Sequence, residues 1–492
     1  MNAPAKFPVK LEDPALLEGR ALIDGEWRWA ASGRTFAVRN PATRETVCEV
    51  ADCGPEETRA AIDAAYEAQK AWAKMLASER SALVMKLRDL MMEHQDDLGA
   101  ILTAEMGKPL AEAKGEIAYG ASFLEWFAEE GKRTYGDVIP TPFHGKRIVT
   151  IKQPVGVVAS ITPWNFPNAM IARKIAPAFA AGCTVVSKPA EQTPLSATAM
   201  AVLAERAGFP AGVFNVVAST DSAAVGEEMC ANPKVRKLTF TGSTEVGRIL
   251  MRQCADDIKK LSLELGGNAP FIVFDDADLD AAVDGAMASK FRNAGQTCVC
   301  ANRIYVQRGV YDAFAEKLVE KVRALNVGDG FEEGVTTGPL IDEQGLEKVE
   351  SHVADALEKG GEAAHGGFRH ALGGTWYTPT VLTGVTQAMK VAKEETFGPV
   401  APLFPFDTEE EAIAMANDTE FGLAAYFYSR DVGRCWRVGE ALEYGIVGIN
   451  DGIISTAVAP FGGVKQSGLG REGSKYGIEE FLEIKYMSMG GL

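Results

Sequence analysis

The sequence predicts an α/β protein made of two successive α/β units. Between residues 155 and 264, short apolar strand patterns alternate with helical patterns. Strands joined in this way by helical crossovers lie parallel in an open, doubly wound sheet. A second alternation begins at Pro270 and continues to about Pro460, and the 492-residue chain is long enough for two or three domains with their own cores.

The region before the first alternation is expected to begin with strands and continue with helices. Residues 21–50 contain short alternating segments with an Asp-Gly and an Asn-Pro turn, which predict strands or hairpins. Apolar residues then recur at helical spacing, which predicts about three helices, over residues 55–76, 77–97 and 97–131. Residues 138–152 contain two prolines and the strand-like RIVTIK, so we expect an extended arm or hairpin there.

The first alternation is a candidate nucleotide-binding unit, because open α/β sheets bind ligands at the carboxyl ends of their strands. Strands are expected at residues 155–161, 184–189, 213–217, 237–242 and 261–265, and helices near residues 167–181, 195–207, 222–230 and 245–254.

The second alternation is expected to start with a strand at residues 271–274 and a helix from Leu279. A strand at residues 303–307 and a helix from Tyr311 follow, and the Gly-rich residues 360–374 predict a surface loop. The C-terminal alternation FLEIKYMSM would be a liability as an exposed edge strand. A partner subunit's sheet or the arm at residues 147–152 would cover it, so we expect an oligomer.

The segment ASKFRNAGQTCVCANR is the first candidate for chemistry. Cys298 follows a run of small polar residues, 293–297, that breaks the helical pattern of residues 281–291. Loops carried on rigid elements concentrate reactive residues, and a thiol is a nucleophile where its surroundings favour the thiolate. Most single cysteines are small buried hydrophobes instead. The residue type therefore leaves catalysis and packing open.

Glycines between a predicted strand and a predicted helix suit a phosphate-binding turn. In FTGSTEVG, Gly242 and Gly247 lack a Cβ where the backbone would pass a ligand, and Ser243 precedes a positive helix end. A simple helix cap is the alternative. The segments TPWNFP and KPAEQTP also follow strands, and Lys188 and Glu191 in the second suit ribose hydroxyls or form a solvated charge pair.

The strand LSLELGGN ends in a carboxylate, Glu264, followed by two glycines. This carboxylate is either a general base beside a ligand or a turn-capping acid.

Taken together, these segments resemble the aldehyde dehydrogenase superfamily. TPWNFP, KPAEQTP, FTGSTEVG, LELGGN, GQTC, EETFGPV, NDTEFGLAA and PFGGVKQSGLGREG occur in its order and spacing and cover nearly the whole chain. The strings FRNAGQTCVCANR and REGSKYGIEEFLEIKY are most similar to succinate-semialdehyde dehydrogenases, with glutarate-semialdehyde dehydrogenases close behind. The resemblance implies a Rossmann-type NAD-binding domain (residues 1–135 and 153–264), an α/β catalytic domain (265–463) and a β bridging or oligomerisation region (136–152 and 475–492).

The resemblance also implies roles for individual residues. Cys298 would be the nucleophile and Glu264 the general base, while Asn165 and the Cys298 N–H would form the oxyanion hole. CoA-acylating relatives lack this glutamate, so Glu264 argues against that reaction. The expected cofactor contacts are Thr162, Pro163, Trp164, Lys188, Glu191, Gly242, Ser243, Gly247, Leu265, Glu395 and Phe397.

Two arginines and a serine indicate the substrate. Arg173, Arg292 and Ser455 match residues that bind the substrate carboxylate in the succinate-semialdehyde enzymes, as the resemblance implies. A pair of guanidinium groups binds a carboxylate through forked hydrogen bonds. A surface position is the alternative for either arginine. We expect oxidation of succinate semialdehyde to succinate. Glutarate semialdehyde, or a broader range of ω-carboxy aldehydes, is the alternative, because one methylene is worth only about 1 to 3 kcal/mol.

Glu191 favours NAD as the cofactor, because a carboxylate accepts hydrogen bonds from ribose hydroxyls but repels a 2′-phosphate. NADP-using relatives often have a small polar residue here, and NADP remains possible. The resemblance further suggests a redox switch through a Cys298–Cys300 disulfide. A packed loop thiol at Cys300 is the alternative, since bridging residues i and i+2 demands strained geometry.

Composition limits the classes of partner, metal site and cellular location that we expect. The net charge of −17 disfavours nucleic acid as a partner, and five scattered histidines predict no metal site. Eight scattered cysteines indicate free thiols, and no apolar run is long enough for a membrane span or a leader. We therefore expect a cytoplasmic homodimer or homotetramer without membrane contact. A dinucleotide-binding protein without turnover and a thiol hydrolase are the alternatives from other classes.

Overall fold

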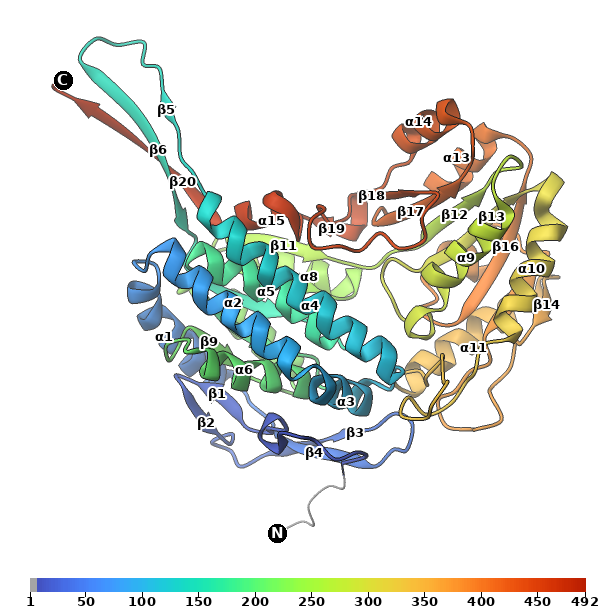
Figure 1. The fold of residues 1–492 in the computed structure, drawn as a ribbon, viewed down its shortest axis with the longest axis horizontal. Helices are drawn as coiled ribbons and strands as arrows, with labels where there is room; N and C mark the ends of the chain where they lie inside the picture. The colour runs from blue at the N-terminus through green and yellow to red at the C-terminus, as the bar shows by residue number, and fades with distance from the viewer. Residues whose placement is uncertain (1–6) are drawn as a thin grey trace.

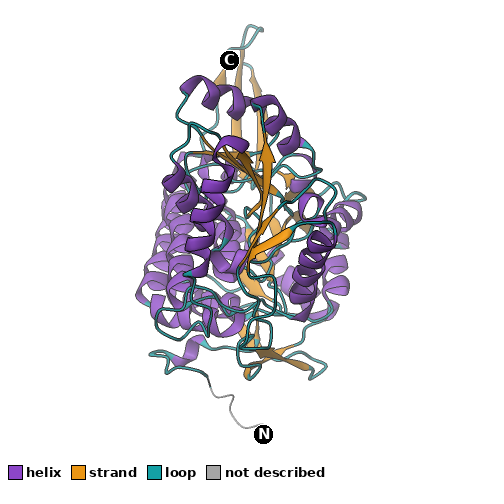
Figure 2. Ribbon diagram, turned by 90° about the vertical axis from the view of Figure 1, so that its right-hand side faces the viewer, coloured by secondary structure: helices purple, strands orange, loops and turns teal. Residues whose placement is uncertain are grey.

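The protein, described here from a computed structural model, has two lobes, each built around a β-sheet, and a hairpin arm that projects from one of them (Figure 1). The structure describes residues 7–492. In the view turned by 90°, helices lie to both sides of the strands (Figure 2). The predicted α/β fold is confirmed. Within residues 7–492, no helix combines the length and the apolar character needed to cross a membrane.

The N-terminal region contains the predicted strands but one more helix than predicted. The strands are β1 (Ala21–Ile23), β2 (Glu26–Arg28), β3 (Thr35–Arg39) and β4 (Thr46–Ala51). The helices are α1 (Pro55–Trp72), α2 (Ala77–Glu93), α3 (Gln95–Met106) and α4 (Leu110–Glu130). The expectation of about three helices was wrong because Gly107, with φ of 90°, ends α3 in the left-handed region. Pro109 then starts a new helix axis, since it has no N–H to continue the old one.

The first sheet positions the predicted nucleotide-binding turns. Its strand order is β19-β11-β10-β7-β8-β9-β1-β2, where β19 is Gly468–Leu469. The five strands from β7 to β11 are parallel to one another, whereas β1 and β19 pair antiparallel with β9 and β11. The chain runs from β7 to β9 in one direction and then places β10 and β11 on the other side of β7. This reversal is a topological switch point, where ligands of open α/β sheets bind. The elements are β7 (Val157–Ile161), α5 (Pro167–Ala181), β8 (Thr184–Lys188), α6 (Leu195–Ala207), β9 (Phe214–Val216), α7 (Ser222–Ala231), β10 (Val235–Thr241), α8 (Thr244–Cys254) and β11 (Lys260–Glu264).

The second sheet has the order β14-β15-β16-β13-β12-β17-β18 and is parallel apart from its edge strand β14. Its strands are β12 (Ala269–Val273), β13 (Ala301–Gln307), β14 (Glu362–His365), β15 (Thr380–Thr383), β16 (Val400–Phe406), β17 (Ala424–Tyr428) and β18 (Ile446–Ile449). Its helices are α9 (Leu279–Lys290), α10 (Tyr311–Arg323), α11 (Glu343–Glu358), α12 (Lys390–Lys393), α13 (Glu409–Asn417) and α14 (Val432–Ala441).

The expectation of a surface loop over residues 360–374 was partly wrong. β14 lies inside this range and pairs antiparallel with β15. Its side chains are mostly exposed, so the strand depends on backbone hydrogen bonds and leaves no apolar alternation in the sequence.

The predicted arm covers the C-terminal strand. β20 (Leu482–Gly490) pairs antiparallel with β6 (Lys146–Pro154), and β5 (Val138–Ile139) completes a three-stranded sheet. Just before it, β19 (Gly468–Leu469) joins the first sheet beside β11, and α15 (Ser474–Glu479) follows. The chain therefore returns from the second sheet to the first before it ends.

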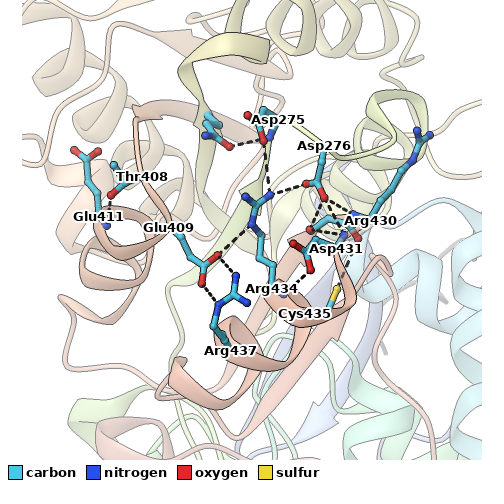
Figure 3. Close-up of polar contacts among 12 residues, drawn as sticks. Asp275, Asp276, Thr408, Glu409, Glu411, Arg430, Asp431, Arg434, Cys435 and Arg437 are labelled. Carbon is cyan, nitrogen blue, oxygen red and sulfur yellow. Dashed lines mark hydrogen bonds and ion pairs between the residues drawn. The ribbon is translucent and has the colours of Figure 1, made fainter.

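A polar cluster at the carboxyl end of β12 is internally paired (Figure 3). Arg434 Nη1 lies 2.8 Å from Asp276 Oδ1, and Arg434 Nε lies 3.2 Å from Glu409 Oε2. Arg437 Nε lies 2.8 Å from the other oxygen of Glu409. Because these charges satisfy one another, the cluster ties α13 and α14 to the sheet.

Candidate active site

Cys298 lies where two cavities meet. It lines a cleft of about 430 Å³ and, on its other side, a small cavity of about 30 Å³. The carboxyl ends of β7, β10 and β11 face the cleft, and the loop that carries Cys298 leads into the amino end of β13. The predicted residues that line the cleft are Pro163, Trp164, Asn165, Gly242, Ser243, Leu265, Cys298, Glu395 and Phe397.

One end of the cleft is formed by the start of α8. Ser243 is the N-cap of α8 and accepts a hydrogen bond from Val246 N at 3.3 Å. The first-turn N–H groups of a helix carry partial positive charge and bind phosphates. A Cβ added at Gly242 would lie 2.4 Å from the Phe240 ring, so the turn depends on glycine at this position.

A carboxylate and two aromatic rings line another part of the cleft. Glu395 Oε1 accepts the Gly267 N–H at 3.0 Å, and burial raises the pKa of Glu395 to about 7. The rings of Trp164 and Phe397 lie edge to face with their centroids 5.5 Å apart. Phe397 adopts a left-handed backbone conformation, with φ of 57°.

Four predicted cofactor residues do not line the cleft. The Thr162 N–H donates to the carbonyl of Lys188, which ties the two turns together. Lys188 Nζ donates to Pro189 O at 3.2 Å and lies 3.9 Å from Glu191 Oε2, and burial lowers the pKa of Lys188 against the pull of Glu191. A Cβ at Gly247 would lie 2.4 Å from the Leu265 side chain, so this glycine allows α8 to pack closely.

The loop before Cys298 has an unusual backbone. Asn293, Ala294 and Gly295 have φ of 53°, 53° and 74°, and side-chain-bearing residues rarely adopt this left-handed region. A Cβ on Gly295 would lie 2.2 Å from Gly398 O, and one on Gly267 would lie 2.4 Å from Cys298 O. These two glycines let the segments GQTC, EETFGPV and LELGGN approach closely.

Asn165 is held against this loop. Its Nδ2 donates to Gln296 O at 3.1 Å, and its Oδ1 accepts the Phe166 N–H at 3.1 Å. The amide of Asn165 and the thiol of Cys298 line the same cleft. This places an amide donor beside the backbone that leads to the thiol.

Glu264 is a buried carboxylate that can accept further hydrogen bonds. Its Oε2 has no hydrogen-bond partner in the described part of the chain. Burial, and then the charge of Glu472, raise the pKa of Glu264 well above its usual value. Glu472 in turn pairs with Arg173 and lies 2.5 Å from Lys174 Nζ. Burial acts to raise the pKa of Glu472, but these two cations hold it below its usual value.

Cys298 is predominantly a neutral thiol at pH 7 in the absence of other molecules. Burial raises its pKa to about 12, although the charges of Arg173 and Arg292 act in the opposite direction. A thiolate would therefore form here only when the thiol transfers its proton to a base.

The small cavity contains the predicted anion-binding residues. Arg173, Arg292 and Ser455 line it together with Cys298, and Tyr119, Met170 and Phe461 supply much of its wall. Arg173 Nη2 and Arg292 Nε are buried atoms without a hydrogen-bond partner among residues 7–492.

The two arginines differ in their charge balance. Arg173 is already paired with Glu472 and packs over the Phe461 ring, 4.0 Å from its centroid. Arg292 has no carboxylate within 4 Å over the described residues and lies over Phe166, 5.3 Å from the ring centroid. Arg292 therefore has no ion-pair partner at contact distance among these residues, although the charges of Arg292 and Glu112 act on each other from further away.

Cys300 lies away from both cavities. Its buried thiol donates to Lys290 O at 3.4 Å, and Cys298 and Cys300 are both free. The switch remains a prediction.

Several residues of this site carry no signal in the sequence that predicts their place. Gln344 and Lys348, at the start of α11, line the cleft. The charges of Glu472 and Lys174 act on the pKa of Glu264. Asp342 before α11 is a readable N-cap, but nothing local to it indicates a cleft. In the part of the chain that the structure describes, no three His, Cys, Asp or Glu side chains are grouped to hold a metal ion.

Known proteins match nearly the whole chain. The profile of the aldehyde dehydrogenase family matches residues 27–487. The chain is 65% identical to the Escherichia coli (strain K12) NADP(+) succinate-semialdehyde dehydrogenase GabD, over 98% of this chain and 100% of that protein. It is 63% identical to the glutarate-semialdehyde dehydrogenase of Pseudomonas aeruginosa, over 98% and 100%. A crystal structure of an E. coli NADP dependent enzyme superposes with a TM-score of 0.97, at 65% identity and the same coverage.

Proposed function

The chain belongs to the aldehyde dehydrogenase family, and from this premise we propose that it oxidises succinate semialdehyde to succinate with NAD(P). The observation that carries the proposal is the position of Cys298 between two cavities. One has the features of a dinucleotide site, and the other has two guanidinium groups with nitrogen atoms that find no hydrogen-bond partner within residues 7–492. An aldehyde with a carboxylate at its far end fits this arrangement.

The cleft residues fit a dinucleotide. The start of α8 suits the pyrophosphate, and Glu395, whose Oε1 accepts the Gly267 N–H, suits one ribose through its Oε2. Lys188 and Glu191 lie outside the lining of the cleft and would reach the adenosine ribose from its edge. When bound, the nicotinamide supplies the acceptor for the hydride that leaves the substrate carbon.

The chain's own residues supply the remaining steps. Arg292, Arg173 and Ser455 bind the carboxylate. The Cys298 thiol gives its proton to water in the cleft, and the resulting thiolate attacks the aldehyde carbon. The Asn165 amide and the Cys298 N–H stabilise the oxyanion of the tetrahedral adduct. Loss of hydride leaves a thioester on Cys298. Glu264 then takes a proton from water, which hydrolyses the thioester and releases the acid and the thiol.

We infer that NAD is preferred over NADP. Glu191 is the basis, because its carboxylate would face a 2′-phosphate as a like charge. The E. coli relative carries NADP(+) in its name, so the proposal of NAD rests on Glu191 alone. Measuring kcat/KM for both cofactors tests it, and a preference for NADP would refute it.

The substrate is tested with three aldehydes. Succinate semialdehyde, glutarate semialdehyde and butanal are compared by NADH formation at saturating NAD. We expect succinate semialdehyde to have the highest kcat/KM and butanal to be slower by orders of magnitude. A higher value for glutarate semialdehyde, the substrate in the name of the P. aeruginosa relative, would favour the alternative. Equal rates with butanal would overturn the carboxylate-binding role of the arginines.

We also propose a homodimer or homotetramer in a reducing compartment such as the cytoplasm. The arm exposes Ile484, Tyr486 and Met489 along β20, and all eight cysteines are free. Light scattering after size-exclusion chromatography measures the assembly, and a monomer at micromolar concentration would refute this part.

A further inference from the structure

A buried ion pair lies behind the candidate active site, at the junction of α3 and α4. Lys108 Nζ lies 2.6 Å from Glu116 Oε2, and the two side chains are 0% and 1% exposed. Removing two charges from water is costly unless further hydrogen bonds satisfy them. The partners of this pair are therefore informative.

The pair holds both sides of Asn165. Lys108 Nζ donates to Asn165 O at 2.8 Å and lies 3.8 Å from the centroid of the Phe166 ring. Glu116 Oε1 accepts the N–H groups of Asn168 and Ala169, at 2.9 and 3.1 Å, in the first turn of α5. The N-cap residue of α5 is Phe166, which makes no side-chain cap. Glu116 thus satisfies the helix start that directly follows Asn165.

A third residue of the same segment holds the Cys298 loop. Glu112 Oε2 accepts the Asn293 N–H at 2.9 Å, at the first of the left-handed residues. Asn293 Nδ2 donates to Asn165 O at 3.0 Å and to Gln296 O at 3.2 Å. The carbonyl of Asn165 therefore receives hydrogen bonds from Lys108 and from Asn293. Strained backbone persists only where its surroundings determine it, and these contacts do so here.

We propose that Lys108, Glu112 and Glu116 are positioning residues for the oxyanion hole. Lys108 and Glu116 set the place of the Asn165 amide, and Glu112 sets the loop that carries the Cys298 N–H. None of the three lines the cleft or the small cavity, so each acts through Asn165 or Asn293. The inference rests on the proposed function, because it requires Asn165 to stabilise the oxyanion.

The chain offers a matched control for a purely structural role. Glu105, three residues before Lys108, is 0% exposed and accepts the N–H groups of Leu195 and Ser196 at 2.7 and 2.8 Å. It thus holds the start of α6 as Glu116 holds the start of α5, but it makes no hydrogen bond to Asn165. Glu105→Gln should lower the thermal midpoint as Glu116→Gln does, and only Glu116→Gln should slow the chemistry.

The test is a double-mutant cycle on the NADH burst, measured by stopped flow at saturating NAD and succinate semialdehyde. Asn165→Ala is expected to lower the burst rate constant about 100- to 1,000-fold, the usual loss for an oxyanion-hole donor. Lys108→Met should lower it at least about tenfold. The double variant should be within about twofold of Asn165→Ala, because residues that act as a unit are non-additive. Cofactor affinity, followed by tryptophan fluorescence, should stay unchanged in Lys108→Met.

Glu112 provides a second route if Lys108→Met does not fold. Glu112→Gln keeps an acceptor for the Asn293 N–H and should retain the burst rate, whereas Glu112→Ala should lose it by about tenfold or more. A wild-type burst in Lys108→Met, multiplicative losses in the double variant, or equal effects of Glu112→Gln and Glu112→Ala would overturn the inference alone. A normal burst in Asn165→Ala would instead overturn the role of Asn165 under the proposed function, and this inference with it.

Discussion

Arg292→Gln should remove substrate selectivity without destabilising the protein. Arg292 has an unpartnered Nε and no carboxylate within 4 Å in the chain from residue 7 onward, so its charge is available to a ligand. A hydrogen bond to a charged group contributes about 1.5 to 3 kcal/mol. Two such bonds to a carboxylate total about 3 to 6 kcal/mol, which corresponds to about 10² to 10⁴ in kcat/KM.

The assay compares kcat/KM for succinate semialdehyde and butanal in wild type, Arg292→Gln and Arg173→Gln. Arg292→Gln should lower only the value for the semialdehyde and leave the thermal midpoint unchanged or higher. Arg173→Gln should slow both aldehydes and lower the midpoint, because breaking a buried ion pair costs about 3 to 5 kcal/mol and Glu472 would lose a partner beside Glu264.

Two results would refute this reasoning. If Arg292→Gln slows butanal as much as the semialdehyde, the arginine serves the reaction and not the carboxylate. If both variants lower the midpoint equally, the difference in charge balance between Arg173 and Arg292 has no energetic consequence.

Three further predictions concern the thiol, the base and the cofactor. Because burial raises the pKa of Cys298 to about 12, the fraction of thiolate should rise about tenfold per pH unit from pH 7 to 9. Iodoacetamide should therefore inactivate the cofactor-free protein about tenfold faster per pH unit over this range. A plateau in the inactivation rate below pH 8 would contradict this. Glu264→Gln should keep an NADH burst but lower steady-state turnover about 10²- to 10⁴-fold, and equal loss of both phases would argue against a role in hydrolysis. Glu191→Ser should raise kcat/KM for NADP relative to NAD, and an unchanged ratio would show that another residue sets the preference.

Local signals predicted most of the elements. α5 and α6 have the predicted bounds because Pro167 begins the first, and Gly182 and Gly208 end them in the left-handed conformation. The break at Gly107 also has a local signal, but apolar spacing continues across it, and we predicted one helix too few. β14 carried no signal, because its pairing with β15 uses backbone groups only.

The sequence by itself determined the family, most of the strands and helices, and the residues expected to act: Cys298, Glu264, Asn165 and the two arginines. These follow from short segments whose spacing is fixed along the chain. Only the tertiary structure decided which ion-pair and hydrogen-bond partners each charged group has. Glu472 pairs with Lys174 from 298 positions away, and Glu112 reaches Asn293 across 181 positions. Such pairings depend on which side chains packing brings into a shared low-dielectric interior, where each charge alters the pKa and availability of its neighbours. No local spacing encodes them, and they give Arg173, but not Arg292, a carboxylate at ion-pair distance among the described residues.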